Sequence, residues 1–579
     1  MLDWLIDRRT CWAGLIGLAL AAPVFGAEDD TAGDGDTAAA DGLAPISVTA
    51  TRNPIAPFDY PGMVTVVGSE EIRERQPSSL DDVLGDVPNV EFTGGPRRTG
   101  EVPSIRGFDG ADVVLTLDGA RQNFLSGHDG RLFVDPSLLR EAEVVRGPAS
   151  ALYGSGGTGG VIALRTVRAR DLLAPGATAG VRLQGGYQGV NDERHGGVTA
   201  YGRPGDGELG LLASVNTRDS GDIELGDGSE VASDDDILSG LVKGNWQHGD
   251  HQELELSYQR FANEAVEPNN GQGAGGDNRV DKDIESETAR MRYTLDDPAN
   301  AWLDLDALVY RSEHRVDERR LDDNGEGPRG ERLERSVTTT GLRLDNRSRV
   351  AEGMTLTYGL ETYTDEQDGA ADGQPRGGVP PGEFDYHAAF VQGEFGWRRP
   401  LGLPGEVTLL PGVRFDAYEA SSRRGEDLED EQTSPRLGLT WKPTPSTLLF
   451  VKRADAFRAP TINEIYPNGV HFTIPGFGVN NFVPSTDLEP QRTETTEVGG
   501  GFRLDGVLAR GDQFDFKLSY FETEGEDFID TEVNQPGPPA CFPPNCNGTT
   551  RSVNVGEAEL WGSEIEADYR IGRLRMALG

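Results

Sequence analysis

The chain has 579 residues, enough for two or more folding units. Its formal net charge of −43 argues against nucleic acid as a partner, because contacts to phosphate need Lys and Arg. Its 77 glycines follow no three-residue period, which argues against collagen and favours many strands and tight turns. After residue 30 there is no apolar run of the roughly 18 residues that a spanning helix needs, although a membrane barrel is compatible with this pattern.

The N-terminus has the pattern of an export signal. Arg8 and Arg9 precede an apolar stretch at 11–20, and small residues follow up to Gly26 and Ala27. We therefore expect residues 1–27 to be a signal peptide, removed in the mature protein. Residues 28–45 are rich in Asp, Ala and Gly, lack aromatic residues, and are expected to be a disordered tether.

A short β-prone segment, Ile46–Arg52, lies between this acidic stretch and Pro54. An extended segment on a tether suits strand addition to the sheet edge of a partner. An ordinary first strand is the alternative interpretation.

Residues 55–170 have a mixed α/β pattern, the size of a unit that folds alone. In chain order, we expect a strand at 64–67, a helix at 69–75 capped by Ser69, and a second helix at 80–84 capped by Ser79. A strand at 113–119 ends in an Asp-Gly turn, a short helix begins at Asp135, and strands follow at 142–145 and 161–166.

From residue 176 to the end, apolar and polar residues alternate in many segments, such as 253–259, 355–361 and 436–442. A sandwich or propeller would bury the apolar face, whereas a membrane barrel would turn it toward lipid. Three features favour the barrel. Long polar loops alternate with short turns, aromatic residues lie near strand ends, and the polar positions include charges that a dry core would not accept. The aromatic residues are Trp302, Tyr310, Trp397 and Trp441, and the charges are Glu255, Asp416 and Arg436.

Two cysteines, Cys541 and Cys546, lie close together in a turn-rich segment. In an exported chain this spacing predicts a disulfide that pins a loop tip. A redox-active pair is the alternative, but no helical pattern follows the second cysteine.

Three stretches resemble TonB-dependent outer-membrane receptors. Ile46–Thr51 is similar to the TonB box, Pro103–Gly107 to the "IRG" element, and Glu143–Gly156 to the "EVxRGPxSxLYG" run. The resemblance implies the outer membrane of a Gram-negative bacterium and a monomer in contact with lipid. It also implies a transmembrane antiparallel β-barrel (176–579) of the 22-stranded type around an N-terminal α/β plug (55–170), after a periplasmic tether (28–54).

The family pattern also assigns residues within this fold. The TonB box (46–52) would bind the TonB inner-membrane energy-coupling complex through Ile46, Ser47, Val48, Thr49 and Ala50. The plug motifs contribute structural residues, which we expect to bind no substrate: Arg106, Gly107, Arg146, Gly147 and Pro148. Both arginines are expected to be buried and to pair with carboxylates of the barrel wall. We count roughly 17 or 18 strands at about ten residues each plus loops, and therefore expect C-terminal strands to be missing.

Within that family, the sequence looks most like the haem and haemoglobin receptors. The similar stretches are 118–124, 127–131, and a "FRAP" box of Phe457, Arg458, Ala459 and Pro460. A second, "NPNL"-like box keeps Asp487 and Leu488 but has Ser485-Thr486 in place of Asn-Pro. His471 lies between the boxes, where that branch carries a haem-ligating His.

Haem iron takes a neutral imidazole nitrogen or a Tyr oxygen as an axial ligand. The candidates are His471 in an aromatic loop, His128 in a plug turn where Asp129 could hold its ring, and Tyr466 as a fallback. The alternative interpretation of His471 and His128 is that each is an ordinary loop histidine that binds no ligand. Haem is here the transported ligand, and neither a resident cofactor nor a metal beyond haem iron is expected.

The predicted function is TonB-dependent uptake of haem, taken from free haem, haemoglobin or a haem carrier. One alternative is a ferric-siderophore receptor of the same fold, and another is binding of a host haem protein without transport. We find no nucleophilic triad, zinc pattern or phosphate loop, since Gly154–Gly157 lacks the following Lys-Ser/Thr. The sequence therefore does not favour an enzyme.

Overall fold

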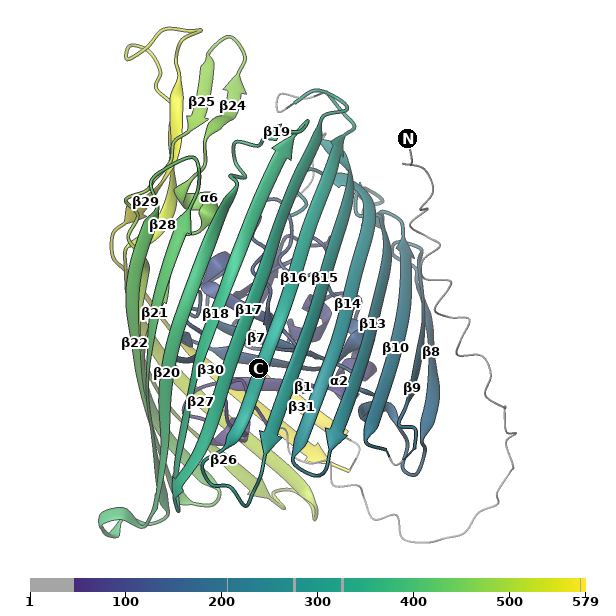
Figure 1. Ribbon diagram of the computed structural model, residues 1–579, viewed down its shortest axis with the longest axis vertical. Helices are drawn as coiled ribbons and strands as arrows, with labels where there is room; N and C mark the ends of the chain where they lie inside the picture. The colour runs from purple at the N-terminus through teal and green to yellow at the C-terminus, as the bar shows by residue number, and fades with distance from the viewer. Residues whose placement is uncertain (1–45, 206, 274–277, 324–326, 573) are drawn as a thin grey trace. The chain divides into compact units, whose positions relative to one another are not determined.

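The computed structural model describes residues 46–205, 207–273, 278–323, 327–572 and 574–579. The predicted signal peptide and the tether up to residue 45 lie outside this range. In the part of the chain that is described, no helix has the length and apolar character needed to cross a membrane. The described chain forms a mixed α/β plug and a large antiparallel β-barrel around it (Figure 1).

The plug is built on a five-stranded sheet in the order β1-β6-β7-β4-β5. Its elements are η1 (Pro57–Asp59), β1 (Val64–Gly68), α2 (Ser69–Arg75), α3 (Asp81–Leu84), β2 (Val90–Thr93), β3 (Val102–Ile105), η2 (Gly110–Asp112), β4 (Val113–Leu117), β5 (Ala120–Arg121), η3 (Pro136–Leu138), β6 (Leu139–Arg146), α4 (Ser150–Tyr153), β7 (Gly160–Thr166) and α5 (Ala169–Leu172). The central strands β4 and β7 are almost entirely buried, which explains their apolar runs, whereas β6 between β1 and β7 also carries charged residues.

Helix α2 covers the predicted residues, but Ser69 is its first residue and not its cap, because Gly68 takes the cap position and no side chain caps the helix. Glu70 and Glu71 lie in its first turn and Arg75 in its last, which suits the helix dipole, and Ile72 is its buried residue. The other two predicted helices differ from expectation. The second begins at Asp81, one residue later than expected, with Leu80 at the cap position. Ser79 still contacts the first turn, since its Oγ accepts the Asp82 N–H at 3.4 Å and its own N–H donates to the Asp82 carboxylate at 3.3 Å. The helix expected from Asp135 is the single 3₁₀ turn η3.

The barrel is an antiparallel sheet of about 18 strands in the described residues, if the two-residue β19 is included. Its members are β8 (Ala179–Gln188), β9 (Glu193–Gly202), β10 (Leu209–Ser220), β13 (Asp235–His248), β14 (Gln252–Pro268), β15 (Arg279–Asp296), β16 (Asp304–Arg320), β17 (Arg332–Ala351), β18 (Met354–Ala371), β19 (Gln374–Pro375), β20 (Gly382–Arg398), β21 (Glu406–Ser421), β22 (Leu428–Thr444), β23 (Thr447–Arg458), β26 (Gln491–Asp505), β27 (Asp512–Glu526), β30 (Ala558–Ile571) and β31 (Leu574–Leu578). The 22-stranded type remains a prediction.

The two faces of the barrel strands differ in polarity. On β14, Leu256 and Tyr258 point outward and are 52% and 36% exposed, whereas Glu255 between them is only 2% exposed. Asp416 and Arg436 are buried in the same way. The charges therefore face the lumen and the apolar side chains face outward, as the alternation predicts for a membrane barrel.

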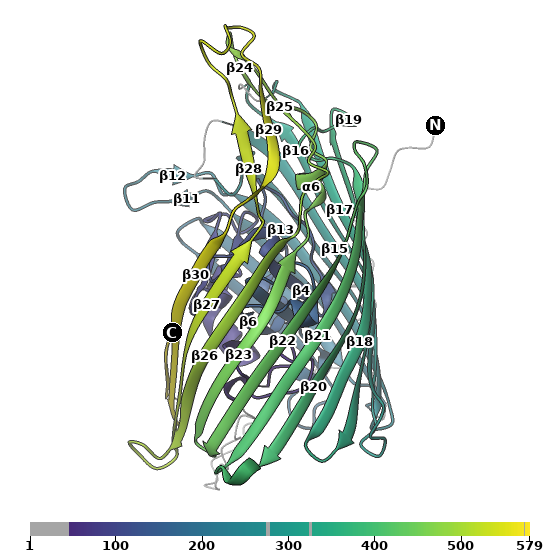
Figure 2. The same cartoon turned by 90° about the vertical axis from the view of Figure 1, so that its left-hand side faces the viewer.

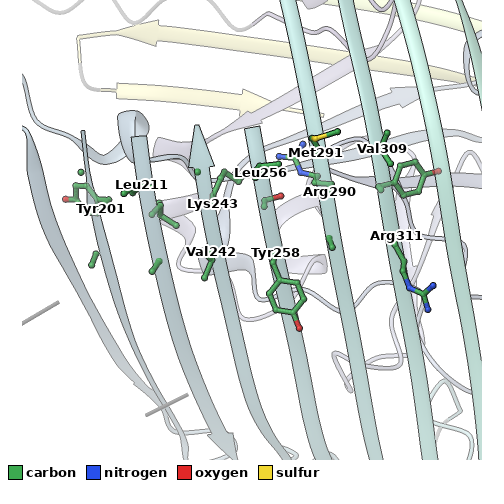
Figure 3. A pocket seen from close by; sticks show the side chains of 18 of the residues that line it. Tyr201, Leu211, Val242, Lys243, Leu256, Tyr258, Arg290, Met291, Val309 and Arg311 are labelled. Carbon is green, nitrogen blue, oxygen red and sulfur yellow. The ribbon is translucent and has the colours of Figure 1, made fainter. Parts of the chain in front are cut away.

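The outer apolar face also contains a depression of about 960 Å³ along strands β9 to β17 (Figure 3). Leu211, Val242, Leu256, Met291 and Val309 line it, each 43–52% exposed. Open apolar surface of this kind on a membrane barrel is a contact area for lipid chains, so the ligand site must be sought elsewhere.

A second, smaller sheet rises beyond one end of the barrel (Figures 1 and 2). It consists of β24 (Gly469–Ile474), β25 (Gly478–Phe482), β29 (Gly548–Val555) and β28 (Phe528–Asn534), in that order, and β25 pairs with β29 in parallel. Helix α6 (Ile462–Ile465) lies at its base, and a disulfide joins Cys541 to Cys546 in the loop between β28 and β29. The short hairpin of β11 (Ile223–Glu224) and β12 (Glu230–Val231) belongs to another loop.

Candidate functional site: the plug apex and its contacts with the barrel

Buried ion pairs hold the plug inside the barrel. The guanidinium of Arg106 binds Glu564 at 2.7 Å and Glu497 at 3.1 Å, two carboxylates of β30 and β26. Arg146 lies 3.6 Å from Glu564 and also pairs with Glu566. Because desolvation of such pairs offsets much of their Coulomb attraction, they position the plug more than they stabilise it.

Gly147 shows why this motif needs glycine. Its φ is +79°, in the left-handed region, and a Cβ on it would come within 2.5 Å of the Arg106 guanidinium. Gly107, which follows Arg106, also has a positive φ of 79°. Pro148 follows Gly147 in the turn that precedes α4. The turn thus brings both arginines against the same wall carboxylate, Glu564.

The FRAP box lies at the end of β23 and is bonded to the plug. The Phe457 N–H donates to Ser150 Oγ at 3.2 Å, and the Ala459 N–H donates to Ser155 Oγ at 2.9 Å. In return, the Gly156 N–H donates to the carbonyl of Phe457 at 3.0 Å. Two motifs that the sequence places about 300 residues apart therefore form one contact.

The remaining box residues extend this contact. Arg458 pairs with Asp112 of the plug at 3.4 Å and with Glu464 of α6 at 2.8 Å, and Pro460 follows at the base of α6. Leu488 of the second box is buried in the same apolar cluster as Phe457, whereas Asp487 is exposed. The contact of the FRAP box with the plug has no local signal in the sequence.

Residues 46–52, the predicted TonB box, are folded against the plug. Glu143 of β6 accepts hydrogen bonds from Ser47 Oγ at 2.6 Å and from the Thr49 N–H at 3.1 Å. Ser47, Thr49 and Ala50 are at most 4% exposed, Val48 is partly buried, and Ile46 is exposed. Within the described residues, the segment pairs with no strand and forms only one isolated bridge, between Ser47 and Ile55.

His128 lies in the plug loop that faces the connection between β14 and β15. The Gln272 N–H of that connection donates to the His128 carbonyl at 3.2 Å. The imidazole Nδ1 is buried and, within the described residues, has no hydrogen-bond partner. Burial lowers the pKa of His128 to about 4, so its ring is neutral at pH 7 and able to bind a metal.

Asp129 does not hold the His128 ring, contrary to the expectation from the sequence. Its carboxylate instead binds Lys282 of β15 at 2.8 Å and the hydroxyl of Ser126 at 2.7 Å. Lys282 is buried and also binds Glu267 at 2.8 Å and Glu318 at 3.4 Å, so a lysine shared by three carboxylates outcompetes a neutral imidazole. Asp129 therefore fixes the loop on the barrel wall and leaves the His128 ring free of it.

His471 lies on β24, in the small outer sheet. Its Nδ1 is 2.9 Å from Thr550 Oγ1 on β29, and its ring contacts Phe472 and Phe482, with centroids 4.9 and 4.3 Å away. Partial burial lowers its pKa. Two aromatic rings beside an exposed imidazole suit the face of a flat apolar ligand.

Tyr466 is placed differently. Its side chain is 0% exposed, and its hydroxyl lies 2.6 Å from the carbonyl of Ala420 and 3.0 Å from that of Glu426. The phenol thus ties α6 to the loop after β21 and presents no oxygen to a ligand. Within the described residues, no group of three His, Cys, Asp or Glu side chains is arranged to hold a bare metal ion.

A plug held by ion pairs in the lumen, inside a barrel with an apolar exterior, defines a plugged membrane-barrel receptor. Two family models match the chain: "TonB-dependent Receptor Plug Domain" over residues 56–161 and "TonB dependent receptor-like, beta-barrel" over residues 222–579. The chain belongs to the TonB-dependent receptor family.

Its relatives include the hemin receptor of Yersinia pestis, 33% identical over 97% of this chain and 81% of that protein. The heme/hemopexin utilization protein C of Haemophilus influenzae is 28% identical over 92% of this chain and 80% of its own length. Among solved structures, the hemophore receptor HasR of Serratia marcescens superimposes with a TM-score of 0.75 at 22% identity, covering 88% of this chain and 80% of that one. This last likeness concerns the fold.

Proposed function

We propose that this protein imports haem across the outer membrane of a Gram-negative bacterium, with energy from the TonB complex. The observation that carries the proposal is His128, a neutral imidazole on the outer loop of the plug whose buried Nδ1 has no described partner. An unprotonated imidazole is what haem iron takes as an axial ligand. Two relatives bearing haem or hemin in their names support the same ligand class.

His471 is the second proposed ligand, on the sheet above the plug. In this proposal it captures haem at the outer sheet, and His128 takes it at the plug. Tyr466 is no longer favoured as a ligand, because its hydroxyl is enclosed. The haem source, whether free haem, haemoglobin or a carrier protein, is set by the outer loops.

Transport follows from two plug states with different affinity for the ligand. The Glu143 contacts hold the TonB-box segment in the state described here. We propose that engagement of residues 46–52 by TonB removes these contacts and shifts the plug, which releases haem toward the periplasm. The proposed division is a signal peptide (1–27), a tether (28–54), a plug (55–170) and a barrel (176–579).

A haem titration of the purified protein, read by the Soret band, tests the ligand assignment. We expect a saturable shift in the wild type that is weakened in His128→Ala and in His471→Ala. His251→Ala is the matched control, because His251 is an exposed residue in the turn between β13 and β14, far along the strand from the outer loops. Absence of a shift in the wild type would overturn the haem proposal and favour a ferric siderophore. Binding without uptake into cells would instead indicate a haem-protein-binding module.

A further inference from the structure

A small cavity of about 100 Å³ lies where the plug apex meets the barrel wall and the FRAP segment. Since a water molecule occupies about 30 Å³ of liquid, this space admits a small polar group but not a whole macrocycle. The charged residues in its lining are Arg121, Arg131, Asp365 and Arg458.

Three of these four charged residues are satisfied by the protein itself. Arg121 pairs with Glu361 at 3.0 Å, and Arg458 pairs with Glu464 at 2.8 Å. The Asp365 carboxylate accepts hydrogen bonds from Asn123 Nδ2 at 2.9 Å and from Thr339 Oγ1 at 2.5 Å. The Nε of Arg458 is buried without a hydrogen-bond acceptor but lies 3.4 Å from the carboxylate of Asp112, so each of the three has a partner in the protein.

Arg131 is different. It is 4% exposed, and its Nη1 donates to two backbone carbonyls, that of Val113 at 2.9 Å and that of Gly110. Its Nε is buried without an acceptor, and within the described residues no carboxylate forms an ion pair with the guanidinium. Burial accordingly lowers its pKa to about 10.

Asp109 and Asp112 act on Arg131 only from beyond ion-pair distance and offset just part of the cost of its burial. A buried charge of this kind is costly, so it is normally retained where it has a function. The planar guanidinium fork matches a carboxylate better than any other common anion-binding side chain does. The loop also holds Arg131 firmly, because its N–H donates to Glu101 O at 3.3 Å and the preceding Gly130 leaves no room for a Cβ, which would lie 2.6 Å from Thr99 O.

Arg131 also lies near the proposed iron ligand. It follows His128 by three residues on the same loop, so their Cα atoms are at most about 10 Å apart. One loop therefore presents a neutral imidazole and an unpaired guanidinium together. A ligand with a metal centre and a carboxylate arm could engage both.

We propose that Arg131 and this cavity form a subsite for one carboxylate arm of the cargo, which for haem is a propionate. The proposal deepens the haem assignment and rests on it. In this subsite the carboxylate enters the cavity and accepts a hydrogen bond from Nε, while Nη1 stays on the backbone carbonyls. Arg131 thereby selects cargo with a free carboxylate and sets its orientation at the plug.

The test compares iron protoporphyrin IX with its dimethyl ester, which lacks the carboxylates, in Soret titrations of the full-length protein. A lost charge-assisted hydrogen bond corresponds to roughly 10- to 100-fold in affinity. We expect the wild type to bind the acid that much more tightly than the ester, and Arg131→Gln to bind both equally. Arg131→Lys should keep part of the discrimination. Arg315→Gln is the matched control, because this half-exposed arginine pairs with Asp317 on the outer side of β16.

The wild-type comparison requires no substitution, so it stands even if Arg131→Gln fails to fold. Equal wild-type affinities for acid and ester would overturn the subsite while leaving the haem assignment intact. Undiminished discrimination in a folded Arg131→Gln would overturn the role of Arg131. Failure of the wild type to bind either porphyrin would overturn the haem assignment itself, and the subsite with it.

Discussion

Substitution of Glu143 by Gln should free the TonB-box segment from the plug. One oxygen of Glu143 accepts both the Ser47 hydroxyl at 2.6 Å and the Thr49 N–H at 3.1 Å, in a site where Glu143 is 0% exposed. A hydrogen bond to a charged group contributes about 1.5–3 kcal/mol and one between neutral groups about 0.5–1.5 kcal/mol. Neutralising the shared acceptor therefore weakens docking by about 2 kcal/mol, which is roughly 30-fold in the docked–released equilibrium.

Thiol modification of a cysteine placed at position 48 measures this equilibrium. Val48 is partly buried in the docked segment, so its reaction rate follows the fraction that is released. We predict a roughly 30-fold faster reaction in Glu143→Gln. Glu141→Gln is the control, since Glu141 shares Arg165 with Glu143 but makes no described contact with residues 46–50. Equal rates in wild type and Glu143→Gln, or equal acceleration by both substitutions, would refute the reasoning.

Three further predictions concern the plug loop, the wall and the exterior. Lys282→Met removes the cation shared by Asp129, Glu267 and Glu318, although Asp129 keeps Arg335 at 3.5 Å, and should cost about 3–5 kcal/mol of stability. Lys442→Met, at the partly exposed pair with Asp59, should cost less than about 1 kcal/mol, and thermal unfolding in detergent compares the two variants. Because burial lowers the pKa of His128 to about 4, its ring is neutral at all pH values above about 5. Haem affinity should therefore stay level from pH 7 to 5 and fall as the pH drops through 4. A decline centred near pH 6.5 would contradict this. Val242→Arg puts a charge on the lipid-facing side of β13. Such a charge costs about 2–4 kcal/mol near the membrane midplane, so this variant should insert less well into lipid vesicles, whereas Val242→Leu should insert normally.

Local patterns in the sequence were sufficient for much of the fold. The inward charges Glu255, Asp416 and Arg436 follow from strict alternation, since neighbouring residues on a strand face opposite sides. Helix α2 follows from the acidic start, the single buried Ile72 and the basic end. Such patterns depend on residues a few positions apart, which is why a single sequence reveals them.

Features that depend on distant residues could not be predicted in this way. Lys282 lies 153 residues from Asp129, and nothing near either residue indicates that they meet. The parallel pairing of Asn480 with Gly548 in the outer sheet likewise has no local signal. The expected Asp129–His128 contact was wrong for this reason, because a cation from the barrel wall, invisible in the local sequence, binds the carboxylate instead.

The sequence distinguishes the candidate ligands only by residue type and neighbours, whereas the structure distinguishes them by exposure and hydrogen bonding. The His128 Nδ1 is buried but has no partner among the described residues, His471 is exposed, and the hydroxyl of Tyr466 is bound by two backbone carbonyls. In the sequence, Arg131 is only the last residue of the 127–131 stretch. Its significance lies in what it lacks among the described residues, a carboxylate partner, and this can be seen only in three dimensions.

Accumulation of ⁵⁵Fe-labelled haem by cells that express this protein, with and without a functional TonB, tests the central claim most directly. The account predicts saturable accumulation that requires TonB and is lost in His128→Ala. Accumulation that is equal without TonB, or no accumulation above cells lacking the protein, would contradict it.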